Sequence, residues 1–208
     1  MRQPFFLGLL SLFLCLSASA QVPHGGEPLW QDQPELSDVP VHRMPGIDLD
    51  ALRAADAVTD AVKSAPWRFG EEFDVNIGLE GGHWSTANGM AVWRTVIEAP
   101  EALAISLRFS AFQLPKGAQL FIWNRDGIEF IGSFDHRNQK EWGGLATGLV
   151  AGDASVVEVH CPSDRVNEVQ LTIDQVVHAY RDVVGKASLF AEALGVCLLY
   201  TSDAADEQ

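Results

Sequence analysis

Apolar and polar residues alternate along most of the chain after residue 73, which is the pattern of strands with one buried face. The alternation is clearest in three stretches, Phe73–Leu79, Ala91–Glu98 and Leu103–Ser110. It returns between turn signals at 119–123, 128–134, 145–150, 155–160 and 169–180. Roughly seven or eight short strands predict a mainly β fold, an antiparallel β-sandwich of the jelly-roll kind with its core between two sheets.

A helical pattern precedes the strands. Asp48 is a suitable N-cap for a helix from Leu49 to about Val62, and Pro66 is expected to end it. Four apolar residues fall on one face of this helix: Leu52, Ala55, Val58 and Val62. The sequence therefore predicts one N-terminal helix followed by the sandwich, together forming a domain over residues 47–184.

Residues 1–20 have the features of a signal peptide. Arg2 provides a positive start, Phe5–Leu16 is almost entirely apolar, and Ala18-Ser19-Ala20 offers the small residues that a signal peptidase requires. The apolar run is shorter than the roughly 20 residues that span a bilayer. We expect cleavage before Gln21, export of the mature chain to the periplasm or medium, and no membrane attachment afterwards. Residues 21–46, rich in Pro and Gly, are expected to form an extended lead-in or a segment draped over the domain surface.

Composition narrows the classes of partner. The chain carries 14 basic and 28 acidic residues, a formal net charge of −14, which disfavours nucleic acids and anionic lipid surfaces. An apolar content of 47% is sufficient for a core. After signal cleavage only Cys161 and Cys197 remain. Export would permit a disulfide, and the alternative is that Cys161 packs as a small apolar residue.

Motifs for catalysis, metals or cofactors are missing from the sequence. It contains no G-x-S-x-G, no Gly-Asp-Ser-Gly-Gly, no H-E-x-x-H, no paired CxxC and no phosphate-binding loop, and its histidines are scattered singly. We expect no catalytic residue, no cofactor and no metal site in this chain.

Tryptophans are the remaining candidates for ligand contact, because aromatic faces can stack on sugar rings. Trp93 and Trp123 lie in predicted strands and are expected in the core. Trp84, beside Gly81-Gly82-His83, and Trp142, before Gly143-Gly144, are expected in surface loops, where they are candidate ligand contacts.

Several stretches in order resemble the N-terminal region of secreted bacterial lysyl-endopeptidase-like serine proteases of the trypsin fold. They span nearly all of the mature chain: Val39–Pro45, Ile47–Leu52, Ala65–Gly70, Asn88–Arg94, Leu114–Ile122, Ile131–Phe134, Trp142–Thr147 and Val177–Arg181. In that family this region lies between the signal peptide and the protease domain. The resemblance implies a precursor domain that accompanies folding, latency or targeting of the enzyme. The family's catalytic histidine, aspartate and serine motifs lie downstream and match no position here.

The end of the chain fits this interpretation. Residues 185–195 are expected to be a linker toward a missing protease domain, with Lys186 as a candidate processing residue. Residues 196–208 resemble the translated adapter tail of truncated metagenomic reading frames and are expected to be non-native.

The sequence thus predicts a non-catalytic pro- or accessory domain of an exported serine endopeptidase precursor, whose partner is its own downstream protease domain. Two alternatives stay open. One is a secreted carbohydrate- or surface-binding β-sandwich module, and the other is a self-contained enzyme.

Overall fold

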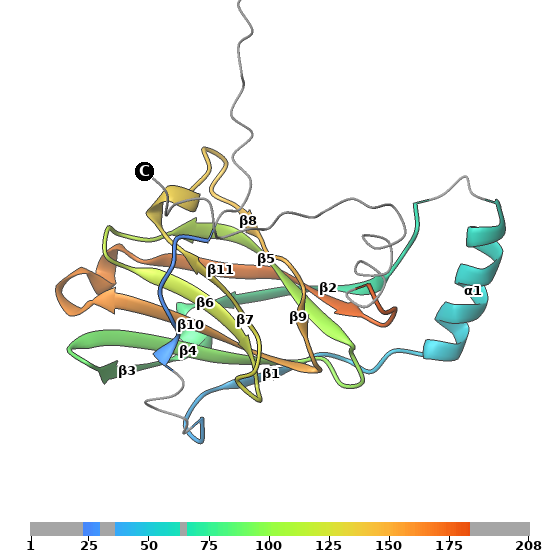
Figure 1. The fold of residues 1–208 in the computed structure, drawn as a ribbon, viewed down its shortest axis with the longest axis horizontal. Helices are drawn as coiled ribbons and strands as arrows, with labels where there is room; N and C mark the ends of the chain where they lie inside the picture. Colours follow the sequence, from blue (N-terminus) through green and yellow to red (C-terminus); the bar gives the residue numbers. More distant parts are fainter. Residues whose placement is uncertain (1–22, 30–35, 63–65, 184–208) are drawn as a thin grey trace, which may run out of the picture.

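The computed structural model describes residues 23–29, 36–62 and 66–183, and these residues form two sheets packed face to face (Figure 1). The six-stranded sheet consists of β1 (Val41–Arg43), β4 (Met90–Glu98), β10 (Ala154–Pro162), β6 (Gln119–Asn124) and β7 (Phe130–Phe134), with β3 (His83–Ala87) also paired to β4. The five-stranded sheet consists of β2 (Gly70–Gly78), β11 (Gln170–Ala179), β5 (Ala104–Gln113), β8 (Leu145–Ala146) and β9 (Val150–Ala151). Every pairing is antiparallel except that of β1 with β4. The predicted mainly β sandwich is confirmed.

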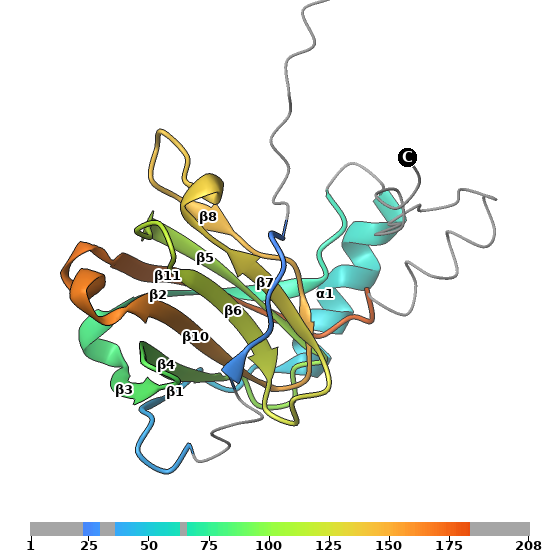
Figure 2. The same ribbon diagram turned by 60° about the vertical axis from the view of Figure 1, so that its left-hand side comes forward.

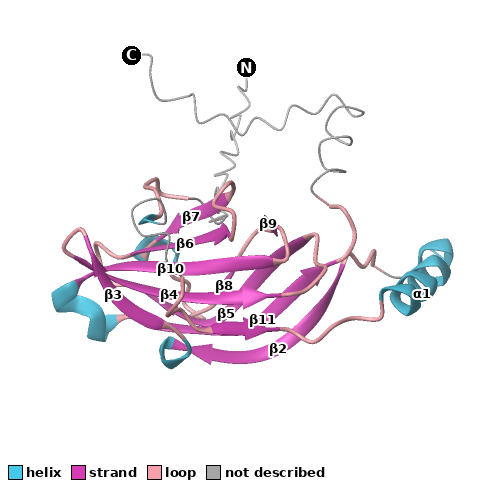
Figure 3. Ribbon diagram, turned by 90° about the horizontal axis from the view of Figure 1, so that it is seen from below, coloured by secondary structure: helices cyan, strands magenta, loops and turns pink. Residues whose placement is uncertain are grey.

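The strand order is that of a jelly roll. We leave out the short strands β1 and β3 and count β8 and β9, which both pair with β5, as one interrupted strand. In chain order, the five-stranded sheet then holds the first, eighth, third and sixth strands, and the other sheet the second, seventh, fourth and fifth. This is the double Greek key arrangement of jelly-roll domains. Figure 3 shows β10, β6 and β7 on one side of the sandwich and β2, β5 and β11 on the other.

The predicted strand at 145–150 is interrupted where Thr147 meets Leu107. The backbone N–H of Thr147 donates to the Leu107 carbonyl at 2.9 Å, and the Thr147 hydroxyl accepts from the Leu107 N–H at 3.0 Å. The Thr147 hydroxyl therefore takes the place of a backbone carbonyl in the hydrogen-bond ladder with β5, and this separates β8 from β9. The remaining predicted strands are present with bounds shifted by a few residues, and the short strands β1 and β3 are additional.

The main core lies between the sheets, where alternate residues of the long strands point inward. Trp93 is 0% exposed at its centre, as predicted. Cys161 is also fully buried there, and it is a free thiol that packs as a small apolar residue. Burial raises the pKa of this thiol above its usual value. Cys15 and Cys197 lie outside the described residues.

The outer face of the six-stranded sheet is buried as well, beneath the lead-in. Val39 and Leu36 pack against Val96, Phe121, Trp123 and Val156 in a second apolar cluster. Residues 23–29 cross β6 and β10 (Figure 2), where the His24 N–H donates to the Ser133 carbonyl at 2.9 Å. The Ser133 hydroxyl and the Gln119 amide both donate to the Gly25 carbonyl. The described parts of the lead-in are therefore an integral cover of the sheet.

A buried charged cluster lies under this cover. Glu158, at the centre of β10, accepts from the Arg94 Nε at 2.7 Å and from the Leu29 N–H at 2.7 Å, and its Oε1 lies 2.5 Å from the Nε2 of His160. Burial alone would raise the pKa of Glu158, but the hydrogen bond to His160 and the charge of Arg94 outweigh it and hold the pKa below its usual value. The carboxylate thus joins two strands to the N-terminal segment.

Helix α1 (Leu49–Val62) has the predicted bounds and cap, but its predicted apolar face is not buried. The Asp48 carboxylate accepts the Ala51 N–H at 3.0 Å. Val58 and Val62 are 69% and 63% exposed, whereas Asp56 is 3% exposed. Asp56 accepts from the Tyr180 hydroxyl at 2.7 Å and pairs with Arg68 and Arg181 at 2.8 and 2.6 Å. Charged contacts, rather than the apolar face, therefore attach α1 to the end of the sandwich (Figure 3).

We predict that Glu158→Gln lowers the free energy of unfolding by about 3–5 kcal/mol, because it leaves the buried Arg94 guanidinium without its carboxylate. Urea unfolding monitored by tryptophan fluorescence measures this loss. The control is Glu168→Gln, which removes an ion pair with Arg165 on the surface and should change the free energy of unfolding far less, because water screens exposed ion pairs. Equal losses in the two variants would contradict the importance of the buried cluster.

We also predict that His178 makes the fold sensitive to mild acid. His178 is 0% exposed, and its pKa is lowered by burial, which the charges of Glu101 and Glu71 only partly oppose. The folded state therefore favours the neutral ring, so the stability it contributes is present above about pH 6.5 and is lost as the pH falls below that value, by at most about 1.4 kcal/mol per pH unit. The variant His178→Leu should show a flatter dependence of unfolding free energy on pH between about 7.5 and 5. Native and variant proteins that lose stability equally over this range would refute the prediction.

Candidate functional site

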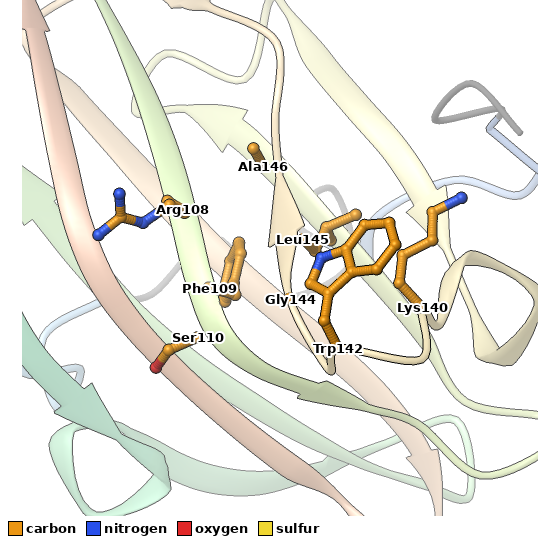
Figure 4. A pocket seen from close by; sticks show the side chains of 8 residues that line it. All are labelled: Arg108, Phe109, Ser110, Lys140, Trp142, Gly144, Leu145 and Ala146. Carbon is orange, nitrogen blue, oxygen red and sulfur yellow. The ribbon is translucent and has the colours of Figure 1, made fainter. Parts of the chain in front are cut away.

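A groove in the described part of the chain lies at the β8 edge of the five-stranded sheet. It has a volume of about 450 Å³, which is within the usual range for ligand sites. Arg108, Ser110, Lys140 and Trp142 line it together with buried Phe109 and Leu145 (Figure 4). Trp142 is 76% exposed, as expected for a surface ligand contact. The structure thus combines a free indole face with a concave surface.

A tight turn holds Trp142 over β5. The Gly143 N–H donates to the Lys140 carbonyl at 2.9 Å, and the Gly143 carbonyl accepts the Phe112 N–H at 2.7 Å. Gly143 has φ +77°, a conformation that L side chains rarely adopt. At Gly144 a Cβ would come within 3.2 Å of the Phe109 carbonyl. The two glycines therefore let the turn lie close against β5 and leave the indole on its surface.

The groove carries cationic side chains on both sides. Arg108 forms a bidentate pair with Asp174, with contacts of 2.7 and 3.0 Å to one carboxylate oxygen. The hydrogen bond to Asp174 raises the pKa of Arg108 above its usual value. Figure 4 shows the Trp142 indole between β5 and Lys140, with Arg108 and Ser110 on the opposite side. These groups can donate hydrogen bonds to hydroxyl or carboxylate oxygens of a ligand that lies on the indole.

The structure corrects the expectation for Trp84. This residue lies within strand β3 and not in a loop, opposite Trp93 of β4, and it packs half-buried against the main core. The Gly81-Gly82 pair has a packing role: a Cβ on Gly82 would come within 2.3 Å of the Trp93 ring, whose Nε1 donates to the Leu79 carbonyl. Glycine is required for this close approach, so the prediction that Trp84 lies in a surface loop is wrong.

Four of the described histidines contact a carboxylate or a backbone carbonyl, whereas neither ring nitrogen of the buried His178 has a hydrogen-bond partner. His160 contacts Glu158, His24 and His136 lie near Asp135, and His42 contacts the Gly81 carbonyl at 2.7 Å. His83, in β3, lies at the opposite edge of the six-stranded sheet from Asp135 and His136, which follow β7, because β4, β10 and β6 separate the two strands. Within residues 23–29, 36–62 and 66–183, no group of three or more His, Cys, Asp or Glu residues could hold a metal ion. Lys186 lies outside the described residues.

A second surface feature, at α1, was not singled out from the sequence. Trp67 is 46% exposed, its ring stacks on Phe69, and the Arg181 guanidinium lies 5.2 Å from its centroid. Arg181 also pairs with Asp60 of α1 at 2.9 Å. Burial alone would raise the pKa of Asp56, but hydrogen bonds from Tyr180, Arg68 and Arg181 lower it. The basic residues around the buried Asp56 come from later parts of the chain. No local periodicity in the sequence predicts such a cluster, so only the fold reveals it.

In the part of the chain that the structure describes, no helix is long and apolar enough to cross a membrane.

Comparisons with known proteins do not assign a family. No protein-family model and no solved structure matches the chain.

Proposed function

We propose that this chain is a non-catalytic pro- or accessory domain of an exported, trypsin-like serine protease precursor, with a downstream protease domain as its partner. The observation that carries the proposal is where the resembling stretches fall in the fold. Val39–Pro45 contains β1 and the buried Met44, and Leu114–Ile122 leads into the central strand β6. Near the end of the described fold, Val177–Arg181 contains the end of β11 and the residues that bind Asp56.

The resembling stretches are therefore those that build one unit. Asn88–Arg94 forms the turn from β3 into β4, Ile131–Phe134 lies in β7, and Trp142–Thr147 includes the glycine turn and β8. A likeness confined to surface positions would suggest a shared ligand, whereas a likeness in the framework suggests a shared domain. The resemblance also stops at Arg181, where the described fold closes on α1. Both features support an accessory domain placed before the enzyme.

Export follows from the signal-like residues 1–20 and belongs to the proposal. The chain from Gln21 onward would fold with its lead-in already in place, because residues 23–29 cover the outer face of the six-stranded sheet. The described contacts of this cover, such as that of the His24 N–H with the Ser133 carbonyl, lie after the expected cleavage point, so signal removal would leave them intact.

The first test is the complete reading frame at the genomic locus. We expect the sequence beyond Gly195 to encode a trypsin-like domain with its histidine, aspartate and serine motifs, and we expect the purified chain from Gln21 onward to hydrolyse no lysyl peptide substrate. A natural stop codon with no protease domain would refute the precursor assignment. Peptide turnover that a single serine substitution abolishes would refute the non-catalytic assignment.

A second candidate function rests on the Trp142 groove. Sugar rings present C–H groups that pack on an indole face, and their hydroxyls can accept from Arg108 and Lys140 at the sides. Such binding would hold a secreted protein on an extracellular glycan. It is compatible with the accessory role, because a domain that binds a surface can retain the attached enzyme near its substrate.

We predict that Trp142→Ala weakens polysaccharide binding about tenfold or more, because it removes the stacking face from the groove. The measurement is affinity electrophoresis or calorimetry against a panel of soluble polysaccharides. Trp67→Ala is the matched control, since Trp67 is also exposed but lies outside the groove. Failure to bind any polysaccharide, or an equal loss with Trp67→Ala, would rule out this candidate.

A further inference from the structure

A β-bulge in β11 turns two adjacent polar side chains to the outer face of the five-stranded sheet. The pairing register of β11 shifts between Ile173 and Gln175 with both of its neighbours, β2 and β5. Ile173 and Val176 are both 0% exposed in the core, so the two residues between them, Asp174 and Gln175, share the outer face. Bulges re-aim side chains beside binding sites, and this one adds a polar side chain to the middle of the sheet.

Strand β5 has a second bulge beside the first. Its register with β11 shifts next to the pair of Ile173 with Phe109. Phe109 and Phe112 are 1% and 2% exposed in the core, so Ser110 and Ala111 between them both lie on the outer face. Ser110 also lines the groove described above. The two bulges therefore extend the polar surface of the groove toward β11.

One row of residues crosses this face from β2 to the groove. The strand register aligns four residues, one each from β2, β11, β5 and β8: Asp74, Gln175, Arg108 and Ala146. Arg108 and Ala146 line the Trp142 groove, so the row continues from the groove across the sheet. Three spacings between neighbouring strands make the row about 14 Å long. It is therefore long enough for a short chain of sugar units and too long for a single one.

Contacts among the side chains of this face fix their orientation. The Gln175 Nε2 donates to a Glu72 carboxylate oxygen at 3.0 Å, and Asp174 holds the Arg108 guanidinium in the bidentate pair described above. Carboxylate, amide and guanidinium groups are planar and present adjacent donors or acceptors. Groups that are already held in place lose little conformational entropy when a ligand binds. The row thus offers fixed hydrogen-bonding groups that suit the neighbouring hydroxyls of sugar rings.

The charge of this face selects among glycans. Asp174 compensates the charge of Arg108, and the charges of Asp74 and Glu72 also act on that arginine. Asp74 and Glu72 are exposed at the β2 edge. A polymer of uronic acids or sulfated sugars would meet them as like charges, on a chain whose formal net charge is −14. The hydroxyls of an uncharged polysaccharide can instead donate to the same carboxylate oxygens.

We propose that the binding site extends from the Trp142 groove across Arg108 and Gln175 to Asp74, and that its ligand is an uncharged linear polysaccharide. One sugar ring packs on the indole, and the units that follow lie on the polar row. This inference rests on the glycan-binding function proposed for the groove, and it adds the direction, the length and the charge of the glycan. A site for several units holds a long chain more tightly than a short fragment.

The test is calorimetry on the chain from Gln21 onward with soluble neutral glucan, xylan and mannan, and with alginate and pectate as acidic counterparts. We expect a neutral polysaccharide to bind, with an affinity of its oligosaccharides that rises about tenfold or more from the disaccharide to the tetrasaccharide. Asp74→Ala with Gln175→Ala should lower the affinity for the tetrasaccharide about tenfold, because it deletes hydrogen-bonding groups of the row, and should leave that for the disaccharide unchanged. Trp142→Ala should weaken the binding of both.

The control is Asp164→Ala with Asn167→Ala, at two exposed positions in the turn Ser163–Glu168 between β10 and β11. It removes the same kinds of side chain and should leave every affinity unchanged, and thermal unfolding verifies that both double variants are folded. Affinity that does not rise with chain length, an equal loss with the control, or tighter binding of alginate or pectate would overturn the extended site while leaving the groove as a glycan site. Absence of binding to every polysaccharide would overturn the glycan-binding function and this inference with it.

Discussion

Burial of strand β10 on both faces is the constraint on which the rest of the structure depends. Residues 154–161 are all buried, although only alternate ones face the core between the sheets. The others need a second cover, and the lead-in supplies it with Leu36, Val39 and residues 23–29. Glu158 lies at the centre of this second layer, where Arg94, His160 and the Leu29 N–H compensate for the loss of water. The N-terminal segment is thus part of the fold.

The two sheets differ in whether the chain itself covers their outer faces, and this difference decides which surface remains for a ligand. The outer face of the six-stranded sheet is occupied by the chain itself, whereas that of the five-stranded sheet carries exposed polar residues such as Arg108 and Asp174. The Trp142 groove lies at the edge of the open sheet, where paired glycines bring a turn close to β5. A binding function would therefore use the face that the lead-in leaves open.

The end of the domain is organised by charge. Asp56 forms ion pairs with Arg68 and Arg181 and accepts a hydrogen bond from Tyr180. These contacts place α1, the start of β2 and the last described residues side by side. The apolar face of α1 remains outside this contact.

Much of the secondary structure could be predicted from the sequence alone, because hydrophobic periodicity and turn residues are local features of the chain. The alternation of Leu103–Ser110 specified a half-buried strand, and Asp48 and the helical spacing specified α1 to its ends. The exposure of Trp142 followed from the glycines of its turn. Tertiary structure alone decided three other features: that Trp84 packs inward, that α1 buries Asp56 and not its valines, and that Glu158 joins β10 to the lead-in. Each depends on residues far apart in the chain, because a buried charge or a close-packed glycine is favourable only beside partners that folding brings to it.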